Sequence, residues 1–227
     1  MSYHFDFSAV LAYWPLFLWG AWQTLKLSAI STILGCMLGT ICAVGRADGA
    51  FWLRGLIACY VEAIRNTPLL VQVFLIYFGF ASLGFKVGAD TAAVVALVVN
   101  VGAYTCEIVR AGLQSIHLSQ IEAAACLGLS RVQTYWHVIV RPAVERVYPA
   151  LTSQYVLLML ASSITSQIST EELTSIADRI QSATFRSFET YIITGFIYII
   201  LTFIVRAAFY AAGQAMFPRR RKLGTVI

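Results

Sequence analysis

The segment Pro149–Ser169, PALTSQYVLLMLASSITSQIS, decides the fold class of this chain. It holds no charged residue, and no charge occurs anywhere between Arg146 and Glu171. A helix rises about 1.5 Å per residue, so about 20 such residues cross the roughly 30 Å hydrocarbon core of a bilayer. The segment therefore predicts a membrane-spanning helix.

Four further apolar segments give five expected spans in all. The spans are about Leu16–Val44, Leu56–Ser82, Ala89–Leu113, Pro149–Ser169 and Tyr191–Met216. Continuous apolar runs favour helices over the short alternating strands of a barrel, and in lipid the backbone must satisfy its own hydrogen bonds. We therefore expect an all-α, polytopic membrane protein with a single transmembrane domain over residues 1–227.

The composition agrees with lipid as the solvent. Of 227 residues, 59% are hydrophobic and 12% are charged, whereas soluble domains carry about 45–50% apolar and about 25% charged residues. The cysteines show neither a CxxC nor a cysteine–histidine metal spacing, so we expect no metal or redox role. The first fourteen residues hold no Lys or Arg, which predicts that the first span acts as an uncleaved signal.

Lys and Arg in the connections predict the orientation. With the N-terminus outside, the cytoplasmic side holds Arg46, Arg54, Arg110, Arg131, Arg141, Arg146, Arg219, Arg220, Arg221 and Lys222. The outer side then holds only Lys86, Arg179 and Arg186. We therefore expect a periplasmic N-terminus, a cytoplasmic C-terminus and a place in a bacterial inner membrane.

The longest connection, residues 114–148, begins with a helical pattern. Glu122–Leu127 has the composition of a good helix former. Gly128 can adopt the positive φ that ends a helix. We therefore expect a short cytoplasmic helix that stops at this glycine.

A second helix is expected directly after it. Ser130 followed by Gln133 fits a capping box, and we expect the helix to end near Arg141 and Pro142. The pattern predicts a helix–turn–helix unit on the cytoplasmic face, which would act as a rigid lever. The plainer alternative is a surface hairpin that only connects two spans.

Small residues follow one another at intervals of four in the first span. They are Ser31, Gly35, Gly39 and Ala43. This spacing lets two helix backbones approach closely. We favour packing within the chain over a seam between two chains.

Four segments carry a family resemblance. Glu122-Ala123-Ala124, followed three residues later by Gly128, is similar to the EAA loop in permease subunits of binding-protein-dependent ABC importers. The other segments resemble the polar amino-acid branch of that family and are Tyr60–Gln72 (YVEAIRNTPLLVQ), Ala103–Ile116 (AYTCEIVRAGLQSI) and Ser162–Ile164 with Glu172-Leu173. The chain departs from the family at Asn66, where Gly is usual, and at Arg141, where Pro is usual.

The resemblance implies a type I importer permease with five transmembrane helices. In such a permease the EAA-type helix docks into a groove on a separate ATPase. The coupling residues carried over are Glu122, Ala123, Ala124 and Gly128. Because the sequence has no GxxxxGK[ST] phosphate loop, we expect a non-catalytic chain without a cofactor of its own, with ATP and Mg on the partner.

The resemblance also implies a set of partners. They are an ATPase dimer, a second permease subunit that is identical or homologous, a periplasmic substrate-binding protein and membrane lipid. No nucleic-acid partner is expected. The expected substrate is a polar amino acid or a close derivative such as an opine.

Polar residues inside the spans are candidates for the substrate path. The candidates are Glu62, Arg65, Asn100, Tyr104, Ser162 and Ser163. Glu62 lies about 12 Å of helix rise beyond Arg54, and a charge at that depth costs about 2.5–3.5 kcal/mol unless it faces protein or a cavity. Pro68 then interrupts the helix, as at transporter substrate sites, although a simple kink is an alternative.

Structural roles for these residues remain open at this point. Glu62 and Arg65 could form an i,i+3 ion pair, and the hydroxyls and amide could simply bond across helices. Glu107 and Arg110 are expected to be a structural pair. A secondary transporter, which would need an ion site and usually paired repeats, and a structural membrane protein or assembly factor are the competing function classes.

Overall fold

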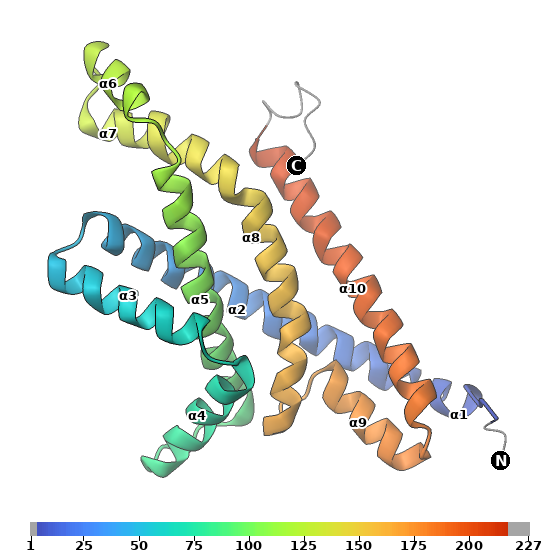
Figure 1. Ribbon diagram of the computed structural model, residues 1–227. Coiled ribbons are helices and arrows are strands. Elements are labelled where there is room, and N and C mark those ends of the chain that lie inside the picture. The colour runs from blue at the N-terminus through green and yellow to red at the C-terminus, as the bar shows by residue number, and fades with distance from the viewer. Residues whose placement is uncertain (1–3, 218–227) are drawn as a thin grey trace.

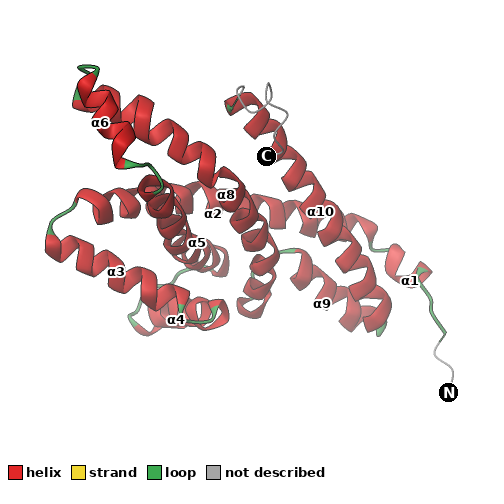
Figure 2. Ribbon diagram, turned by 45° about the horizontal axis from the view of Figure 1, so that its top comes forward, coloured by secondary structure: helices red, strands yellow, loops and turns green. Residues whose placement is uncertain are grey.

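The computed structural model describes residues 4–217, and within them every regular element is a helix (Figures 1 and 2). The α-helices are α1 (Ser8–Leu11), α2 (Trp14–Asp48), α3 (Phe51–Arg65), α4 (Leu69–Ser82), α5 (Ala89–Gln114), α6 (Leu118–Cys126), α7 (Arg131–Gln133), α8 (Arg141–Ala161), α9 (Leu173–Thr184) and α10 (Ser187–Met216). A π-helical stretch, Thr134–Val140, joins α7 to α8, and a 3₁₀ stretch, Ser162–Ile168, follows α8. The expected all-α fold is confirmed. Arg219, Arg220, Arg221 and Lys222, which entered the orientation argument, lie outside the described residues.

Within residues 4–217, four helical stretches are long and apolar enough to cross a bilayer by themselves. They are Trp14–Asp48, Ala89–Gln114, Arg131–Ile168 and Ser187–Met216. A fifth crossing exists only if α3 and α4, which are bent by 110° at their break, count as one span. The expected continuous span Leu56–Ser82 is therefore two helices. Pro68 lacks an amide hydrogen and disfavours helix in the residue before it, which explains the break.

The expected helix end near Arg141 and Pro142 is wrong. The helix that begins at Arg131 continues through the π-helical stretch and α8 to Ile168, a run of 38 residues. Pro142 lies in the first turn of α8, directly after the π-helical stretch. The wider turns of a π-helix accommodate a ring without an amide hydrogen more easily than a continuous α-helix does. The helix that carries the fourth expected span therefore begins inside the expected cytoplasmic connection.

The contact between α2 and α5 forms the centre of the molecule. Ser31, Gly35, Gly39 and Ala43 are all buried on α2. A Cβ at Gly35 would lie 2.1 Å from Val101 Cγ1, so only glycine allows this approach. The small-residue face packs within the chain, as expected.

We expect Gly39→Ala to lower thermal stability. Its Cβ would lie 2.5 Å from Thr105 Cβ and 2.6 Å from the Gly102 carbonyl oxygen, and backbone cannot move aside locally. Overpacking of this kind costs about 1–3 kcal/mol, or about 2–12 °C in Tm for a chain of this size. Gly55→Ala is the matched control because a Cβ there meets nothing within 4 Å. The measurement is the Tm of each variant in detergent solution. Equal Tm values for Gly39→Ala and Gly55→Ala would contradict the packing argument.

Candidate functional site

The hairpin of α6 and α7 projects from one end of the helical body (Figure 1). The amide of Gly128 donates to the Ala125 carbonyl oxygen at 3.0 Å, and the amide of Leu129 donates to the Ala124 carbonyl oxygen at 3.1 Å. These two bonds and the φ of +71° at Gly128 form a Schellman motif. The expected glycine stop of the first helix is therefore present.

The second arm starts with the expected capping box. The Gln133 amide donates to Ser130 Oγ at 3.3 Å, and the Ser130 amide donates to Gln133 Oε1 at 2.9 Å. The turn between the arms is therefore held by four local hydrogen bonds, two from the Schellman motif and two from the capping box. A hairpin fixed in this way can transmit force to the helix that continues from it.

The hairpin exposes both polar and apolar side chains. Glu122, Ala123 and Gly128 are exposed, whereas Ala124 is buried against the chain itself. Leu118 and Leu127 are 75% and 79% exposed. Large apolar side chains exposed next to a carboxylate are typical of a surface that a protein partner covers.

The break between α3 and α4 is tied to α5 through one buried glutamine. Gln72 Nε2 donates to the Ile64 carbonyl oxygen at 2.7 Å and to the Thr67 carbonyl oxygen at 3.0 Å. Gln72 Oε1 accepts from Asn100 Nδ2 at 2.9 Å. The carbonyl groups freed by the break therefore find a partner, and Asn100 is fixed in place. The sequence contained this glutamine within an apolar helix, but no pattern showed that it would cap the break.

Glu62 and Arg65 do not form the ion pair considered as an alternative. Glu62 accepts from Asn66 Nδ2 at 3.1 Å, and the Arg65 guanidinium lies 5.5 Å from the centre of the Tyr104 ring. Within residues 4–217 no ion pair joins the two side chains. Both residues are exposed.

The six path candidates divide into two groups. Glu62, Arg65, Asn100 and Tyr104 come together where the α3–α4 break meets α5. Ser162 and Ser163 lie in the 3₁₀ stretch after α8, and their hydroxyls donate to carbonyl oxygens three residues earlier. Across the described residues no hydrogen bond connects these serines with the first group.

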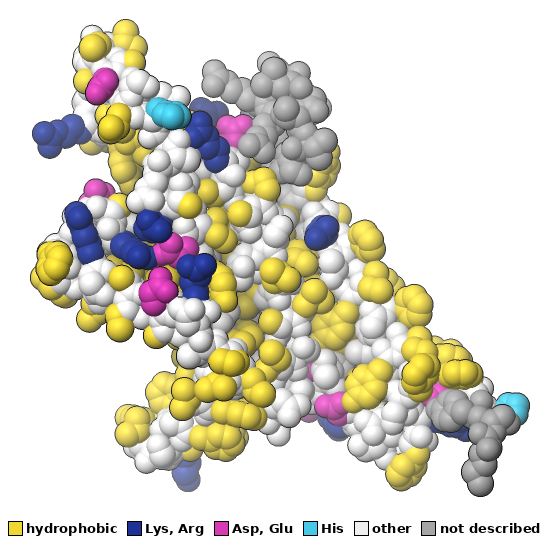
Figure 3. Space-filling view, in the orientation of Figure 1, with side chains coloured by type: hydrophobic (Ala, Val, Ile, Leu, Met, Phe, Trp, Pro, Cys, Tyr) yellow, Lys and Arg dark blue, Asp and Glu magenta, His cyan; other side chains and the backbone are white. Residues whose placement is uncertain are grey.

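Glu107 connects the ends of two helices. It forms ion pairs with Arg46 at the end of α2 and with Arg110 on α5, the latter at 2.7 Å. The expected structural pair of Glu107 and Arg110 is confirmed, and Arg46 is an additional member. In Figure 3, dark-blue side chains gather over this part of the molecule, near the turn between α2 and α3.

The turn into α9 is built on a fully buried carboxylate. Glu172 accepts from the amides of Thr174 and Ser175 at 2.9 and 2.7 Å, and from the Tyr198 hydroxyl at 2.8 Å. Burial raises the pKa of the Glu172 carboxyl, although these hydrogen bonds act in the opposite direction. The Glu172-Leu173 motif is therefore a helix cap that joins α9 to α10. Among the described residues, no three His, Cys, Asp or Glu side chains are grouped to hold a metal ion.

Comparisons with known proteins agree over almost the whole chain. Residues 35–221 match the family described as "Binding-protein-dependent transport system inner membrane component". The octopine transport system permease protein of Rhizobium radiobacter is 34% identical, with 91% of each chain covered. The glutamine transport system permease protein of Escherichia coli K12 is also 34% identical, with 88% of this chain and 93% of the relative covered.

Solved structures show the same fold. The crystal structure of an amino acid ABC transporter with histidines matches with a TM-score of 0.87 and 36% identity, covering 94% of this chain and 100% of that chain. The MetNI methionine ABC transporter in an inward-facing conformation matches with a TM-score of 0.75 and 20% identity, covering 90% and 98%, and supports the fold alone.

Proposed function

The chain belongs to the family of binding-protein-dependent transport system inner membrane components, and we propose that it carries a polar amino acid or an amino-acid-derived opine. It is the non-catalytic, membrane-spanning subunit of an amino-acid ABC importer and a multi-pass protein of the inner membrane. Relatives are named for octopine, glutamine and arginine transport. These compounds share an α-carboxylate and a nitrogen cation, so one charged path suits all of them.

The projecting hairpin is the observation that supports a role as the transport subunit driven by a separate ATPase. It exposes Glu122 and Gly128, and its second arm begins the helix Arg131–Ile168. An ATPase that pulls on the hairpin would therefore move a membrane span without an intervening flexible loop. We propose that Glu122, Ala123 and Gly128 contact the ATPase directly and that the buried Ala124 supports the helix that presents them.

The assembly follows from this role. Importers of this family work with an ATPase and a substrate-binding protein. We propose two ATPase subunits, which hold ATP and Mg, and a second permease subunit that is identical or homologous. The transmembrane path would lie between the two permeases.

The path itself is proposed at the α3–α4 break. Glu62 would attract the ammonium group of the substrate and Arg65 its carboxylate. Tyr104 would support Arg65, whose guanidinium lies over its ring, and Asn100 would fix the α3–α4 break through Gln72. Broken helices near the bilayer midplane are where transporters commonly bind substrate. Ser162 and Ser163 would belong to a separate part of the path, with the partly exposed Ser163 at its surface and the fully buried Ser162 supporting the helix behind it.

We propose that the N-terminus is periplasmic and the C-terminus cytoplasmic. The distribution of basic residues supports this orientation. A tag after Ile227 should react with an impermeant reagent only from the cytoplasmic side, and a tag before Met1 only from the periplasmic side. Labelling of both tags from one side would contradict the orientation.

Purification of the native complex tests the function. A tag on this chain should retain an ATPase, and mass spectrometry should identify a polar amino acid or opine among bound molecules. Uptake of the labelled form of the identified substrate into proteoliposomes should require ATP. An excess of unlabelled glutamine, arginine or octopine should reduce that uptake, whereas a neutral sugar should not. ATP-independent uptake without an ATPase partner would instead indicate a secondary transporter.

A further inference from the structure

A cavity of about 310 Å³ lies where α2 and the first turn of α5 meet the segment that precedes α9. Its polar wall comprises Gln23, Lys26, Asp90, Thr91, Thr170 and Glu171. Asn100 of the proposed path follows Asp90 by ten residues on α5, or about 15 Å of helix rise. The cavity is therefore separate from that path. Its volume is at the small end of the range for ligand pockets, about 300–1,000 Å³, so it suits one small molecule.

Lys26 is an unpaired charge in an apolar helix. It lies ten residues after Leu16 in the expected span Leu16–Val44, and no other Lys or Arg occurs on α2 before Arg46. Lys26 is exposed, and within residues 4–217 its ammonium group forms no hydrogen bond or ion pair. Charges inside membrane helices face a cavity or a partner, and they are candidates for function by default.

Two carboxylates line the same cavity, and one of them is already balanced. Glu171 forms an ion pair with Arg179 at 3.3 Å. Asp90, in the first turn of α5, is exposed and has no hydrogen bond or ion pair in the described part of the chain. Glu172, the next carboxylate in the sequence, accepts the hydrogen bonds that cap α9 and does not line the cavity. One cation, Lys26, and one anion, Asp90, are therefore left for an occupant.

Thr170 contributes a hydroxyl group without a partner. The residue is 2% exposed, and its Oγ1 has no hydrogen-bond partner within the described chain. A buried hydroxyl without a partner is unfavourable, because it has lost its hydrogen bonds with water. Since Thr170 lines the cavity, a polar occupant would supply the missing hydrogen bond.

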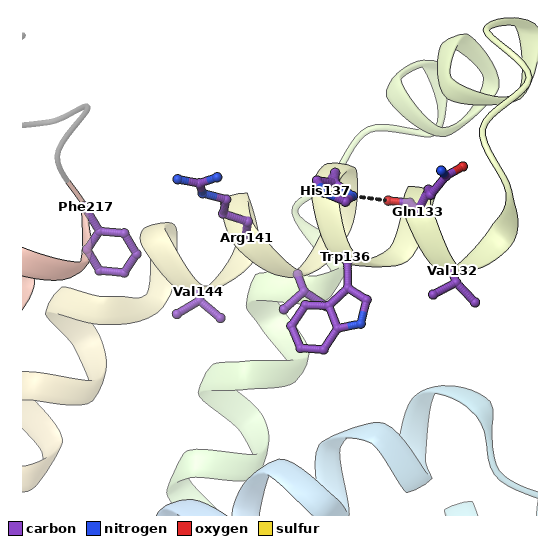
Figure 4. Close-up of a pocket in the computed structure, with 8 residues that line it drawn as sticks. Val132, Gln133, Trp136, His137, Arg141, Val144 and Phe217 are labelled. Carbon is purple, nitrogen blue, oxygen red and sulfur yellow. Dashed lines mark hydrogen bonds between the residues drawn. The ribbon is translucent and has the colours of Figure 1, made fainter.

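One unpaired cation and one unpaired anion in a small cavity favour a zwitterion. A ligand with a single charge would leave either Lys26 or Asp90 unpaired, whereas the ammonium and carboxylate groups of an amino acid match both. The cavity at the base of the hairpin differs in this respect. Figure 4 shows His137 and Arg141 on one side of that helix and Trp136 on the other, and no carboxylate lines that cavity.

We propose that the cavity between α2 and α5 is a second binding site for the substrate and recognises the zwitterionic head group of an amino acid. Lys26 would bind the carboxylate, Asp90 would bind the ammonium group, and the Thr170 hydroxyl would donate to the carboxylate. In the proposed orientation α5 begins at the periplasmic side, so the site would hold an amino acid before it reaches the α3–α4 break. The site rests on the proposed function for its substrate class.

Labelling of a cysteine in the cavity wall tests this site. The Thr91→Cys permease is assembled with the ATPase in nanodiscs, without binding protein. Mass spectrometry of the peptide that carries position 91 then measures its rate of reaction with a maleimide. Because a ligand fills most of such a pocket, we expect an excess of L-glutamine to slow the reaction about threefold. N-acetylglutamine, which lacks the ammonium charge, and the α-amide of glutamine, which lacks the carboxylate, should not slow it.

Two further cysteine positions complete the measurement. Gln23→Cys reports from the α2 wall of the cavity and replaces Thr91→Cys if that variant does not assemble. Ser82→Cys lies at the exposed end of α4, does not line the cavity and should react at the same rate with and without glutamine.

Charge variants in the Thr91→Cys protein separate this site from general surface charge. Lys26→Gln and Asp90→Asn should each raise the glutamine concentration needed for protection about tenfold. Lys26→Arg should retain the protection, and so should Lys86→Gln, which removes an exposed cation outside the cavity.

Four results would each overturn the site. They are no protection by glutamine, equal protection by all three compounds, protection of Ser82→Cys, and unchanged protection in Lys26→Gln. ATP-driven uptake without protection would overturn this site alone and leave the proposed function standing. Protection without ATP-driven uptake would support the site and count against the proposed function.

Discussion

Gly128→Asp is expected to reduce ATP-driven uptake at least tenfold while the protein still inserts into the membrane. The φ of +71° at Gly128 disfavours any residue with a Cβ by about 1–2 kcal/mol. Within the chain, a Cβ at this position meets nothing within 4 Å, so the new side chain would not disturb internal packing. It would instead place bulk and a negative charge on the surface proposed to contact the ATPase, where burying an unpaired charge is strongly unfavourable.

Gly128→Asn is the matched control for this result. Asparagine has nearly the shape of aspartate, carries no charge and tolerates positive φ better than most residues. We expect the Gly128→Asn variant to retain most of the uptake. Tagged permease carrying this change should also retain most of the ATPase in a pull-down. Immunoblotting should show equal amounts of both variants in the membrane. Normal uptake by Gly128→Asp would remove the hairpin from the coupling mechanism. Equal losses in both variants would assign the effect to bulk or backbone strain rather than charge.

The hairpin was predictable because its signals are local. The Ser130–Gln133 capping box and the Gly128 stop each depend on a few neighbouring residues, and both are present. The passage of the helix through Pro142 was not predictable in this way. Proline normally ends a helix, and it is tolerated here because π-helical turns precede it. Neither the spacing of apolar residues nor the capping signals distinguish π-helical turns from α-helical ones.

The candidate residues of the proposed path could be named from the sequence, but their contacts could not. Spacing along α3 suggested an ion pair between Glu62 and Arg65, because an i,i+3 rule considers only one helix. In the structure Arg65 instead lies over Tyr104 of α5, 39 positions later in the chain. The bond between Gln72 and Asn100 likewise requires the 110° bend that brings the α3–α4 break against α5. Contacts between separate helices cannot be obtained from spacing within one of them.

Glu62→Gln is expected to reduce uptake at least tenfold with the complex assembled and basal ATPase activity retained. The Glu62 carboxylate is exposed, and its partner is the amide of Asn66, which can donate equally well to a glutamine oxygen. The fold should therefore tolerate the change. Without its negative charge, residue 62 would no longer attract the substrate cation. Asp48→Asn is the control: it removes an exposed carboxylate at the end of α2 and should have little effect on uptake.

The double variant Glu62→Gln with Arg65→Gln distinguishes a ligand role from a structural pair. If the two side chains stabilised each other, the single change would leave an unpaired arginine, and the second change would restore assembly and some uptake. Since Arg65 lies over Tyr104 and not against Glu62, we expect no such recovery. Uptake of labelled substrate into proteoliposomes, measured beside the amount of assembled complex, decides between them. Full uptake by Glu62→Gln alone would exclude both roles, because a residue needed for binding or for assembly cannot lose its charge without effect.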